Sequence, residues 1–594
     1  MSTAILTGQP VPGSPLEGDL RSLGFDVRVA SDAADVETLL AAVPGDQRVA
    51  VVDARFVGHV HALRLGLTDP RFAASAVPGA VTAKPEARTA LTHALRTSAE
   101  ATAPLPDSLA AAMESGATDV HRPELGTLVA TVPTDPQTRN EARQAVAAVD
   151  DEAVRLRTAV KSRDGFFTTY CISPYSRYIA RWCARRGLTP NQVTTASLLT
   201  ALIAAGCAAT GTRGGFVAAG LLLIFSFVLD CTDGQLARYS LQYSTLGAWL
   251  DATFDRAKEY AYYAGLALGA ARGGDDVWAL ALGAMVLQTC RHVVDFSFNE
   301  ANHDATANTS PTAAISDKLD SVGWTVWVRR MIVLPIGERW AMIAVLTAVT
   351  TPRITLVVLL IGCAFAACYT TAGRVLRSLT RKATRTDRAA GALADLADNG
   401  PLASAFAALK PGAWLRAAPV LAFVGGAVLV GAALSNPYGS PLVVAAAALY
   451  VALSGLALVM PLKAPLDWLV PPFFRAAEYG TVLVLAAKAD VNGALPAAFG
   501  LVAAVAYHHY DTVYRIKGGT GAPPAWLVRA IGGQEGRTLV VALAAALLSA
   551  TDFTVALTAL AVAVALVVLV ESIHFWVTAH KRGAPAVHDE GEPA

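Results

Sequence analysis

The sequence predicts a multi-pass α-helical membrane protein with a small soluble α/β domain at its N-terminal end. Apolar residues make up 54% of the 594 residues and charged residues only 16%, whereas soluble domains carry about 25% charged residues. Twelve apolar stretches approach the ~20 residues that a helix needs to cross a bilayer. Because 48 basic residues nearly balance 47 acidic ones, the net charge gives no case for a nucleic-acid partner.

Residues 1–150 form the expected soluble domain. Short runs rich in β-forming residues alternate there with stretches rich in alanine and leucine, which is typical of an α/β fold. The expected strands are residues 3–6, 25–30, 49–52 and 127–132. The turn from Gly8 to Gly13 is similar to a phosphate-binding loop, but it lacks the glycine spacing and the lysine of a P-loop. Nucleotide binding is therefore the weaker alternative for this domain.

Residues 151–187 are a basic segment, with eight Arg or Lys against three acids. Arg177, Arg181 and Arg185 recur every four residues, while Tyr178 and Trp182 share another helical face. This pattern predicts an amphipathic helix that lies on an anionic membrane surface. An ordinary solvated linker helix is the alternative.

The apolar stretches fall into two sets of six. The first set lies within residues 188–380, and its spans are 191–211, 214–233, 244–270, 276–298, 337–351 and 354–377. The second set lies within residues 411–577, and its spans are 412–434, 439–461, 468–487, 493–513, 537–551 and 553–577. A polar linker at 381–410 separates the two sets, and a disordered tail at 578–594 is expected after them.

The topology follows from the start of the chain and from the position of the basic linker. The first residues show neither a basic region nor a long apolar run, so we expect no signal peptide and a cytosolic N-terminus. Six crossings return the basic linker to the cytosol, as the positive-inside rule requires. We therefore expect a plasma-membrane protein whose soluble domain and active site face the cytoplasm.

Four carboxylates mark the candidate site. Asp230 and Asp233 lie three residues apart, and Asp251 and Asp255 lie four apart, so each pair shares one helical face. An ionised side chain in an apolar helix is costly unless it is used. Two such faces brought together make an all-oxygen cage of the kind that Mg²⁺ or Mn²⁺ prefers, whereas zinc would need His or Cys.

The segment 230–255 resembles the signature of the CDP-alcohol phosphatidyltransferase family, D-x2-D-G-x2-A-R-x8-G-x3-D-x3-D, and all eight specified positions match. The resemblance covers about 160–380. The stretch 164–174 is similar to what precedes the membrane core in bifunctional inositol-phosphate cytidylyltransferase/transferase fusions. Residues 1–150 depart from that pattern, because no glycine-rich loop with a following lysine is present. The soluble domain is thus either a degenerate nucleotidyltransferase relative or unrelated.

The resemblance implies an enzyme that moves a substituted phosphate from a CDP-alcohol, such as CDP-diacylglycerol, to an acceptor alcohol with release of CMP. It implies two Mg²⁺ or Mn²⁺ ions held by Asp230, Asp233, Asp251 and Asp255, with Asp255 as the general base. The residues expected to bind the CDP-alcohol are Gly234, Ala237, Arg238, Ser244, Gly247, Asn191 and Thr194.

The acceptor alcohol is not identified by the sequence. Arg291, Arg339 and Arg374 could bind an acceptor phosphate, but basic residues near the ends of spans are also explained by the positive-inside rule.

The second set of helices resembles the first. Residues 249–260 align with 468–479 at an offset of 219, and seven of the twelve positions are identical. Weaker matches join 291–295 to 507–511 and Arg339 to Arg537.

This similarity predicts a diverged, catalytically inactive duplicate, because Val470 stands where Asp251 is expected and Phe474 where Asp255 is. Relatives with this motif are generally dimeric, so we expect a pseudo-dimer within one chain or a homodimer. The alternative is chance similarity between apolar repeats. His292 with Asp295, and His508 with Asp511, are interpreted as interhelical hydrogen-bond pairs and not as metal sites.

Two other function classes stay open. Two six-helix halves with acids inside the membrane also describe a transporter, and a non-catalytic scaffold is the third possibility. A carrier would place polar residues near the middle of the membrane in both halves, whereas here the acids gather at one end of one half.

Overall fold

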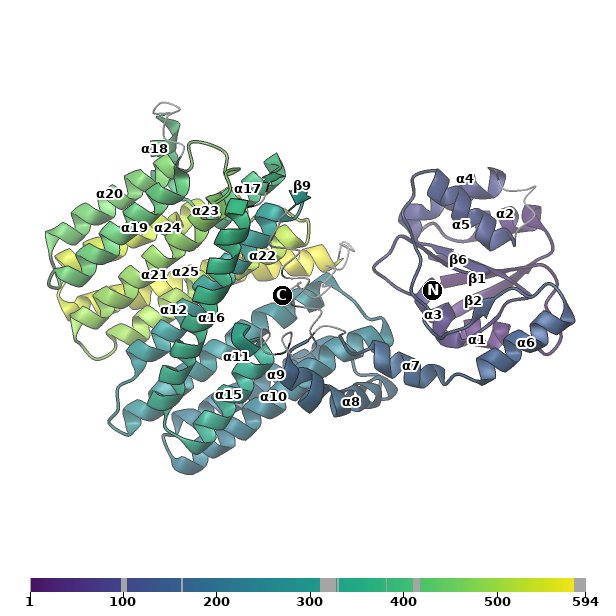
Figure 1. The fold of residues 1–594 in the computed structure, drawn as a ribbon, viewed down its shortest axis with the longest axis horizontal. Coiled ribbons are helices and arrows are strands. Elements are labelled where there is room, and N and C mark those ends of the chain that lie inside the picture. Colours follow the sequence, from purple (N-terminus) through teal and green to yellow (C-terminus); the bar gives the residue numbers. More distant parts are fainter. Residues whose placement is uncertain are drawn as a thin grey trace.

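The computed structural model describes residues 2–97, 104–161, 164–309, 331–380, 382–409 and 417–581, together with Trp327. An N-terminal α/β domain and a larger helical part are joined by a connector that begins beneath the N-terminal domain and ends against the helical part (Figure 1). The fold class expected from the sequence is confirmed at this level.

A six-stranded sheet forms the centre of the N-terminal domain, in the order β2-β1-β3-β6-β5-β7. β1 pairs in parallel with β2 and β3, whereas β6 pairs antiparallel with β3 and β5. The strands of this sheet are β1 (Ser2–Thr7), β2 (Phe25–Ala30), β3 (Val49–Asp53), β5 (Ala74–Val77), β6 (Ala80–Ala83) and β7 (Val120–His121).

Helices cover both faces of this sheet, because successive strand residues point to opposite sides. Ile5 packs with the helices α2 (Ala33–Ala42), α4 (Arg88–Thr97) and α5 (Leu105–Ser115), whereas Leu6 packs with α1 (Leu16–Ser22) and α3 (Val60–Leu67). Figure 1 shows the two helical layers above and below the strands.

The strand expectations for this domain need two corrections. The expected strand at 127–132 shrinks to β8 (Ala130–Thr131), which pairs only with β4 (Val57–Gly58) outside the main sheet. The β5–β6 hairpin was not expected, because its strands are four residues long and rich in alanine, which gives little β signal.

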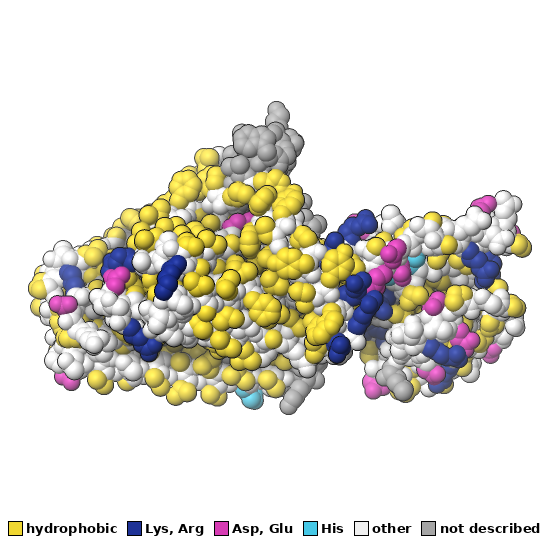
Figure 2. Space-filling view, turned by 90° about the horizontal axis from the view of Figure 1, so that it is seen from below, with side chains coloured by type: hydrophobic (Ala, Val, Ile, Leu, Met, Phe, Trp, Pro, Cys, Tyr) yellow, Lys and Arg dark blue, Asp and Glu magenta, His cyan; other side chains and the backbone are white. Residues whose placement is uncertain are grey.

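The connector consists of α6 (Pro136–Ala147), α7 (Asp151–Thr158), the π-turn η2 (Thr168–Ile172) and α8 (Ser173–Arg185). On α8, the side chains of Tyr178, Trp182 and Arg185 are exposed. An apolar surface covers most of the helical part, and basic side chains gather where it meets the N-terminal domain (Figure 2).

Each of the twelve expected spans overlaps a helix, and residues 412–416 of the seventh span lie outside the described residues. The helices of the first set are α9 (Pro190–Ala209), α10 (Arg213–Ser240), α11 (Thr245–Arg272), α12 (Trp278–Asn302), α15 (Ile336–Val349) and α16 (Pro352–Thr380). The helices of the second set are α19 (Ala418–Ser435), α20 (Pro441–Ala457), α21 (Val470–Ala489), α22 (Ala494–Lys517), α24 (Gly533–Leu547) and α25 (Ala550–Lys581).

By length and composition, five helices of the described chain can cross a membrane. These are α9, α10, α16, α19 and α25. Large apolar side chains on them, such as those of Leu221, Phe365 and Leu566, are more than half exposed. Such exposure is costly in water and is expected against lipid.

Helix packing follows one plan in both sets. In the first set α9 contacts α10 and α11, α10 contacts α15, and α12 contacts α16. In the second set α19 contacts α20 and α21, α20 contacts α24, and α22 contacts α25. The two sets meet where α11 and α12 pack against α21, α22 and α25.

The segment between the two sets is itself packed. It contains α17 (Asp387–Leu396) and α18 (Pro401–Ala408), with α17 against α12, α21 and α22 and with α18 against α20 and α24. Leu393 and Asp398 are buried there. The expected linker at 381–410 therefore contributes to the helical core over much of its length.

Candidate active site

The four aspartates come together because a short turn joins α10 to α11. α10 ends where Leu241 adopts a left-handed conformation, with φ of 52°. Ser244 then caps α11, and its Oγ accepts the backbone N–H of Gly247 at 2.9 Å. Carboxylate oxygens of Asp230, Asp233 and Asp251 all lie within 4.8 Å of one another. These three side chains are close enough to share one cation.

Asp255 lies beside a lysine that the sequence analysis did not select. Nζ of Lys258 is 2.8 Å from Oδ1 of Asp255, and it also contacts Oδ1 of Asp230. The hydroxyl of Ser197 also lies near this nitrogen, at 3.2 Å. The lysine side chain is 0% exposed. A charged residue three positions after Asp255 in an apolar helix was the signal that could have identified it.

The start of α9 forms one wall of the site. Thr189 and Gln192 close a capping box, so that Asn191 and Thr194 occupy the first turn. The hydroxyl of Thr194 donates to Oδ2 of Asp233 at 2.6 Å and lies 3.0 Å from the carbonyl oxygen of Pro190. Thr194 thus orients one carboxylate of the cluster.

Gly247 lies where α9 and the start of α11 pack closely. A Cβ atom at this position would lie 2.7 Å from Oδ1 of Asn191 and 2.8 Å from Oγ of Ser244. Both distances are shorter than van der Waals contact. The structure therefore brings Asn191, Ser244 and Gly247 together.

The last turn of α10 faces the connector. Nε of Arg238 donates to the carbonyl oxygen of Ala159 at 2.6 Å, and a Cβ on Gly234 would lie 3.5 Å from the same guanidinium group. The carbonyl oxygen of Ala237 accepts the backbone N–H of Gln242 at 3.0 Å, which helps to end the helix. The guanidinium group of Arg238 is thus anchored at the edge of the site.

The N-terminal domain reaches the same edge. The guanidinium group of Arg71 lies 4.1 Å from the ring centre of Tyr243, in the turn between α10 and α11. In the connector, Arg155 stacks at 3.6 Å over Tyr239, whose hydroxyl donates to Glu152 at 2.8 Å. These contacts place the soluble domain beside the candidate site.

Two of the three arginines considered for an acceptor phosphate are already paired. Arg339 pairs with Glu259 at 2.9 Å, and Arg374 pairs with Asp295. Arg291 is buried and donates to the carbonyl oxygen of Val333, while its Nε and Nη1 make no hydrogen bond to the residues that the structure describes.

The two expected His–Asp pairs do not form. His292 bonds to the hydroxyl of Tyr510 at 2.5 Å, and His508 lies 3.2 Å from Asp398. Asp511 instead pairs with Arg515 at 2.8 Å. Each histidine meets a neighbouring segment and not the acid one turn further along its own helix.

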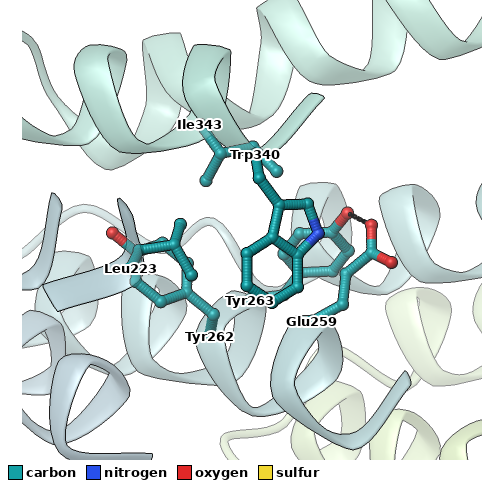
Figure 3. A pocket seen from close by; sticks show the side chains of 6 residues that line it. All are labelled: Leu223, Glu259, Tyr262, Tyr263, Trp340 and Ile343. Atoms are coloured by element: carbon teal, nitrogen blue, oxygen red, sulfur yellow. Dashed lines mark hydrogen bonds between the residues drawn. The ribbon is translucent and has the colours of Figure 1, made fainter. Parts of the chain in front are cut away.

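A small pocket lies next to the site, between α10, α11 and α15 (Figure 3). Aromatic and aliphatic side chains line it, and its one acidic group is Glu259. That carboxylate accepts the Tyr263 hydroxyl at 2.5 Å and pairs with Arg256 and Arg339. The acidic group of this pocket is therefore held by partners within the protein.

Comparison with protein families agrees with this geometry. Residues 187–368 match the family model of CDP-alcohol phosphatidyltransferase. They form a CDP-alcohol phosphatidyltransferase domain. All four aspartates of the site lie within this transferase domain. Residues 387–594 match a different model, a family of unknown function (DUF5941).

Curated relatives match the transferase domain over part of their own length. Phosphatidylinositol phosphate synthase of Streptomyces avermitilis is 33% identical over 130 residues, which are 21% of this chain and 51% of the relative. Archaetidylinositol phosphate synthase of Pyrococcus horikoshii is 31% identical, over 19% of this chain and 58% of the relative. Bifunctional IPC transferase and DIPP synthase of Aquifex aeolicus is 32% identical, over 19% of this chain and 26% of the relative.

The chain thus spans between a quarter and somewhat more than half of these relatives. The resemblance to the family, with relatives that include bifunctional fusions, is confirmed for the transferase domain.

Proposed function

We propose that the protein is a membrane phosphotransferase that moves a substituted phosphate from a CDP-alcohol to an acceptor alcohol and releases CMP, in the synthesis of polar lipids. The observation that carries this proposal is the clustering of Asp230, Asp233 and Asp251 within 4.8 Å, in a domain that matches the family. In the same domain, Gly247 of the signature packs closely against Asn191 beside these carboxylates.

Mg²⁺ or Mn²⁺ is the cofactor that fits this centre. Every group that the four aspartates offer is a carboxylate oxygen, which hard divalent cations prefer. The hydroxyl of Thr194 holds Asp233 in place from outside the cluster, as hydrogen-bond partners of metal ligands do. When bound, the metal would supply positive charge that offsets the pyrophosphate of the CDP-alcohol.

The protein's own residues divide the remaining tasks. Asp255, at the far side of the carboxylate group, is proposed as the base that takes the proton of the acceptor hydroxyl. The close-packed wall of Asn191, Ser244 and Gly247, with Thr194 behind it, is proposed to bind the nucleotide. The opposite edge would be lined by Gly234, Ala237 and Arg238, where a guanidinium group suits phosphate oxygens.

A phosphorylated polyol is the acceptor that the comparisons favour. Two of the relatives are named as phosphatidylinositol phosphate synthase and archaetidylinositol phosphate synthase. The buried guanidinium of Arg291, with two nitrogens that make no hydrogen bond to the described residues, is the candidate for the acceptor phosphate.

The second set of helices is proposed to be an inactive duplicate that completes a pseudo-dimer. The equivalent helices pair in the same way in both sets. A buried Arg–Glu–Arg group recurs between the third and fifth helices of each set, as Arg256–Glu259–Arg339 and Arg475–Glu478–Arg537. Such a polar group is costly to bury, so its presence in both sets favours common ancestry.

Contacts across the interface support a two-fold relation between the sets. The ring of Trp249 stacks on Trp576 at 5.8 Å, while Nε1 of Trp468 donates to Ser378 at 3.0 Å. Trp468 follows Trp249 by 219 residues, and Trp576 follows Ser378 by 198. The start of the third helix of each set therefore meets the sixth helix of the other set at matching positions.

A second pair of contacts relates the fourth and sixth helices within each set. Asp295 pairs with Arg374 in the first set, and Asp511 accepts the hydroxyl of Ser572 at 2.7 Å in the second. Asp511 follows Asp295 by 216 residues, and Ser572 follows Arg374 by 198. An aspartate thus stands at the matching position of both sets, whereas the residue that it contacts differs. Because apolar residues replace two of the four carboxylates, the second set is proposed to take no part in the chemistry.

The remaining assignments are also proposals. The end of α10 that carries the site contacts the connector and the N-terminal domain, and the positive-inside rule favours a cytoplasmic position for that side of the plasma membrane. The N-terminal domain is proposed to be a degenerate relative of a nucleotidyltransferase, since β1 lies between β2 and β3 and is followed by the Gly8–Gly13 turn.

A transporter is the second candidate, and the placement of the acids disfavours it. The buried acids Glu478 of the second set and Asp398 of the segment before it are neutralised by Arg475 and Arg537. A carrier needs polar groups that can exchange their partners for the transported molecule. These acids are instead paired with arginines of the protein itself.

The test is CMP release by the purified full-length protein with Mg²⁺, CDP-diacylglycerol and a panel of alcohols that includes inositol phosphates. We expect turnover with one class of acceptor, its loss on chelation with EDTA, and its return with Mg²⁺ or Mn²⁺. Asp251→Asn should abolish turnover, whereas Asp490→Asn, an exposed position at the end of α21, should not. Full activity of the Asp251→Asn protein would overturn the proposal.

A further inference from the structure

The four aspartates of the proposed metal centre are not arranged around one point. Asp230, Asp233 and Asp251 share one group of oxygens within 4.8 Å, and Asp255 is outside that group. Asp255 instead faces Nζ of Lys258 at 2.8 Å, and Asp230 contacts the same nitrogen. The carboxylates thus surround two positions, and an ammonium group occupies the second.

We propose that Lys258 takes the place of one of the two cations implied by the resemblance, so that the centre binds a single divalent ion at Asp230, Asp233 and Asp251. This inference rests on the proposed function. It adds a positioning residue: the ammonium group would hold Asp255 in place and balance its charge, as a second metal ion would otherwise do.

Lys258 is held in place by burial and by its polar and aromatic neighbours. Its side chain is 0% exposed, and the hydroxyl of Ser197 lies 3.2 Å from Nζ. The ring of Trp340 lies 5.4 Å from the same atom, a distance at which an aromatic face attracts a cation. A second divalent ion between Asp230 and Asp255 would lie within a few ångströms of this fixed positive charge, and like charges at such a distance repel strongly.

The second set of helices supports a role of Lys258 in the metal centre and not in packing. At the offset of 219, Ala477 stands where Lys258 is found, next to Val470 and Phe474 in place of the two carboxylates. The Arg–Glu–Arg group is kept in both sets, but the lysine is absent where the carboxylates are absent. A lysine needed only to join helices would have no reason to disappear with them.

Metal stoichiometry tests the proposal directly. Purified full-length protein is dialysed against a saturating concentration of Mn²⁺, and bound metal is measured by mass spectrometry and by electron paramagnetic resonance. We expect one magnetically isolated Mn²⁺ per chain. Lys258→Met should bind two Mn²⁺ with a spin-coupled signal, while Lys258→Arg should still bind one. Lys488→Met, whose lysine bonds to backbone carbonyl groups near the C-terminal end of α21, should match the wild type.

The outcomes separate this inference from the proposed function. Two coupled ions in the wild-type protein would overturn the role of Lys258 and leave the proposed metal centre intact. A Lys258→Met protein that still binds one ion would also overturn it. If the wild type binds no Mn²⁺, the proposed function fails and the inference fails with it. Because the wild-type stoichiometry is itself decisive, a variant that does not fold leaves the proposal testable.

Discussion

Replacing Glu478 by glutamine should destabilise the protein without changing its chemistry. The Glu478 side chain is 3% exposed and accepts from Arg475 at 2.9 Å and Arg537 at 2.7 Å, while Asp398 pairs with the same two arginines. Two positive and two negative charges balance in this cluster. Glu478→Gln leaves one buried guanidinium uncompensated, a change that costs about 3–5 kcal/mol when one partner of a buried pair is removed.

Thermal unfolding in detergent measures this effect. For a domain of the size of the second set of helices, this loss of unfolding free energy corresponds to a fall in Tm of roughly 6–20 °C. CMP release for each folded molecule should stay near the wild-type value. Glu300→Gln is the matched control, because its partner Arg388 is half exposed and also pairs with Asp304, and pairs that reach solvent are worth about 1 kcal/mol or less.

A double variant separates lost charge balance from lost packing. Replacing Arg475 and Glu478 together by leucine leaves Arg537 with Asp398, a balanced pair at 2.7 Å. The double variant should therefore be more stable than Glu478→Gln. A Glu478→Gln protein as stable as the wild type, or one that folds but has lost its kcat, would refute the reasoning.

Three further changes test other parts of the molecule. Asp255→Asn should lower kcat by roughly 10²–10⁴ and keep most of the affinity for the CDP-alcohol; equal losses of binding and turnover would make Asp255 a ligand only. Gly247→Ala should raise the KM for the CDP-alcohol, because its Cβ would lie 2.7 Å from Asn191, whereas Gly431→Ala meets open space and should not. Burial and the nearby Arg155 lower the pKa of His61 to about 4. Since the unfolded imidazole titrates near ~6.5, acidification from pH 7 to 4 should weaken the N-terminal domain by up to about 3 kcal/mol. Hydrogen exchange should detect this loss, and His61→Leu should remove it.

The helices and the candidate site could be predicted because their signals are local. Apolar spans follow from the length that a bilayer requires, and each one overlaps a helix. Asp230 and Asp233 share a helical face by their spacing alone. Because the turn after Ser240 is short, α11 places Asp251 beside them.

What could not be predicted depends on partners distant in sequence. Lys258 also contacts Asp230 in another helix, 28 residues earlier, and the sequence does not reveal that this contact joins it to both pairs of aspartates. Asp398 lies in a polar stretch that looks like a linker, yet the fold inserts it between Arg475 and Arg537. The imidazole of His508 bonds to the same inserted aspartate and not to the acid three residues further along its own helix. In each case tertiary packing, and not local pattern, selects the partner.

The contacts of Trp249 with Trp576 and of Trp468 with Ser378 have a consequence for how this protein can evolve. In a homodimer, one codon specifies both copies of an interface residue, so every substitution appears on both sides of the interface at once. In the pseudo-dimer proposed above, the two equivalent positions are encoded separately, and one is tryptophan while the other is serine. In a single chain of this kind, a substitution can change one side of the interface at a time. One half also need not keep the residues that catalysis requires.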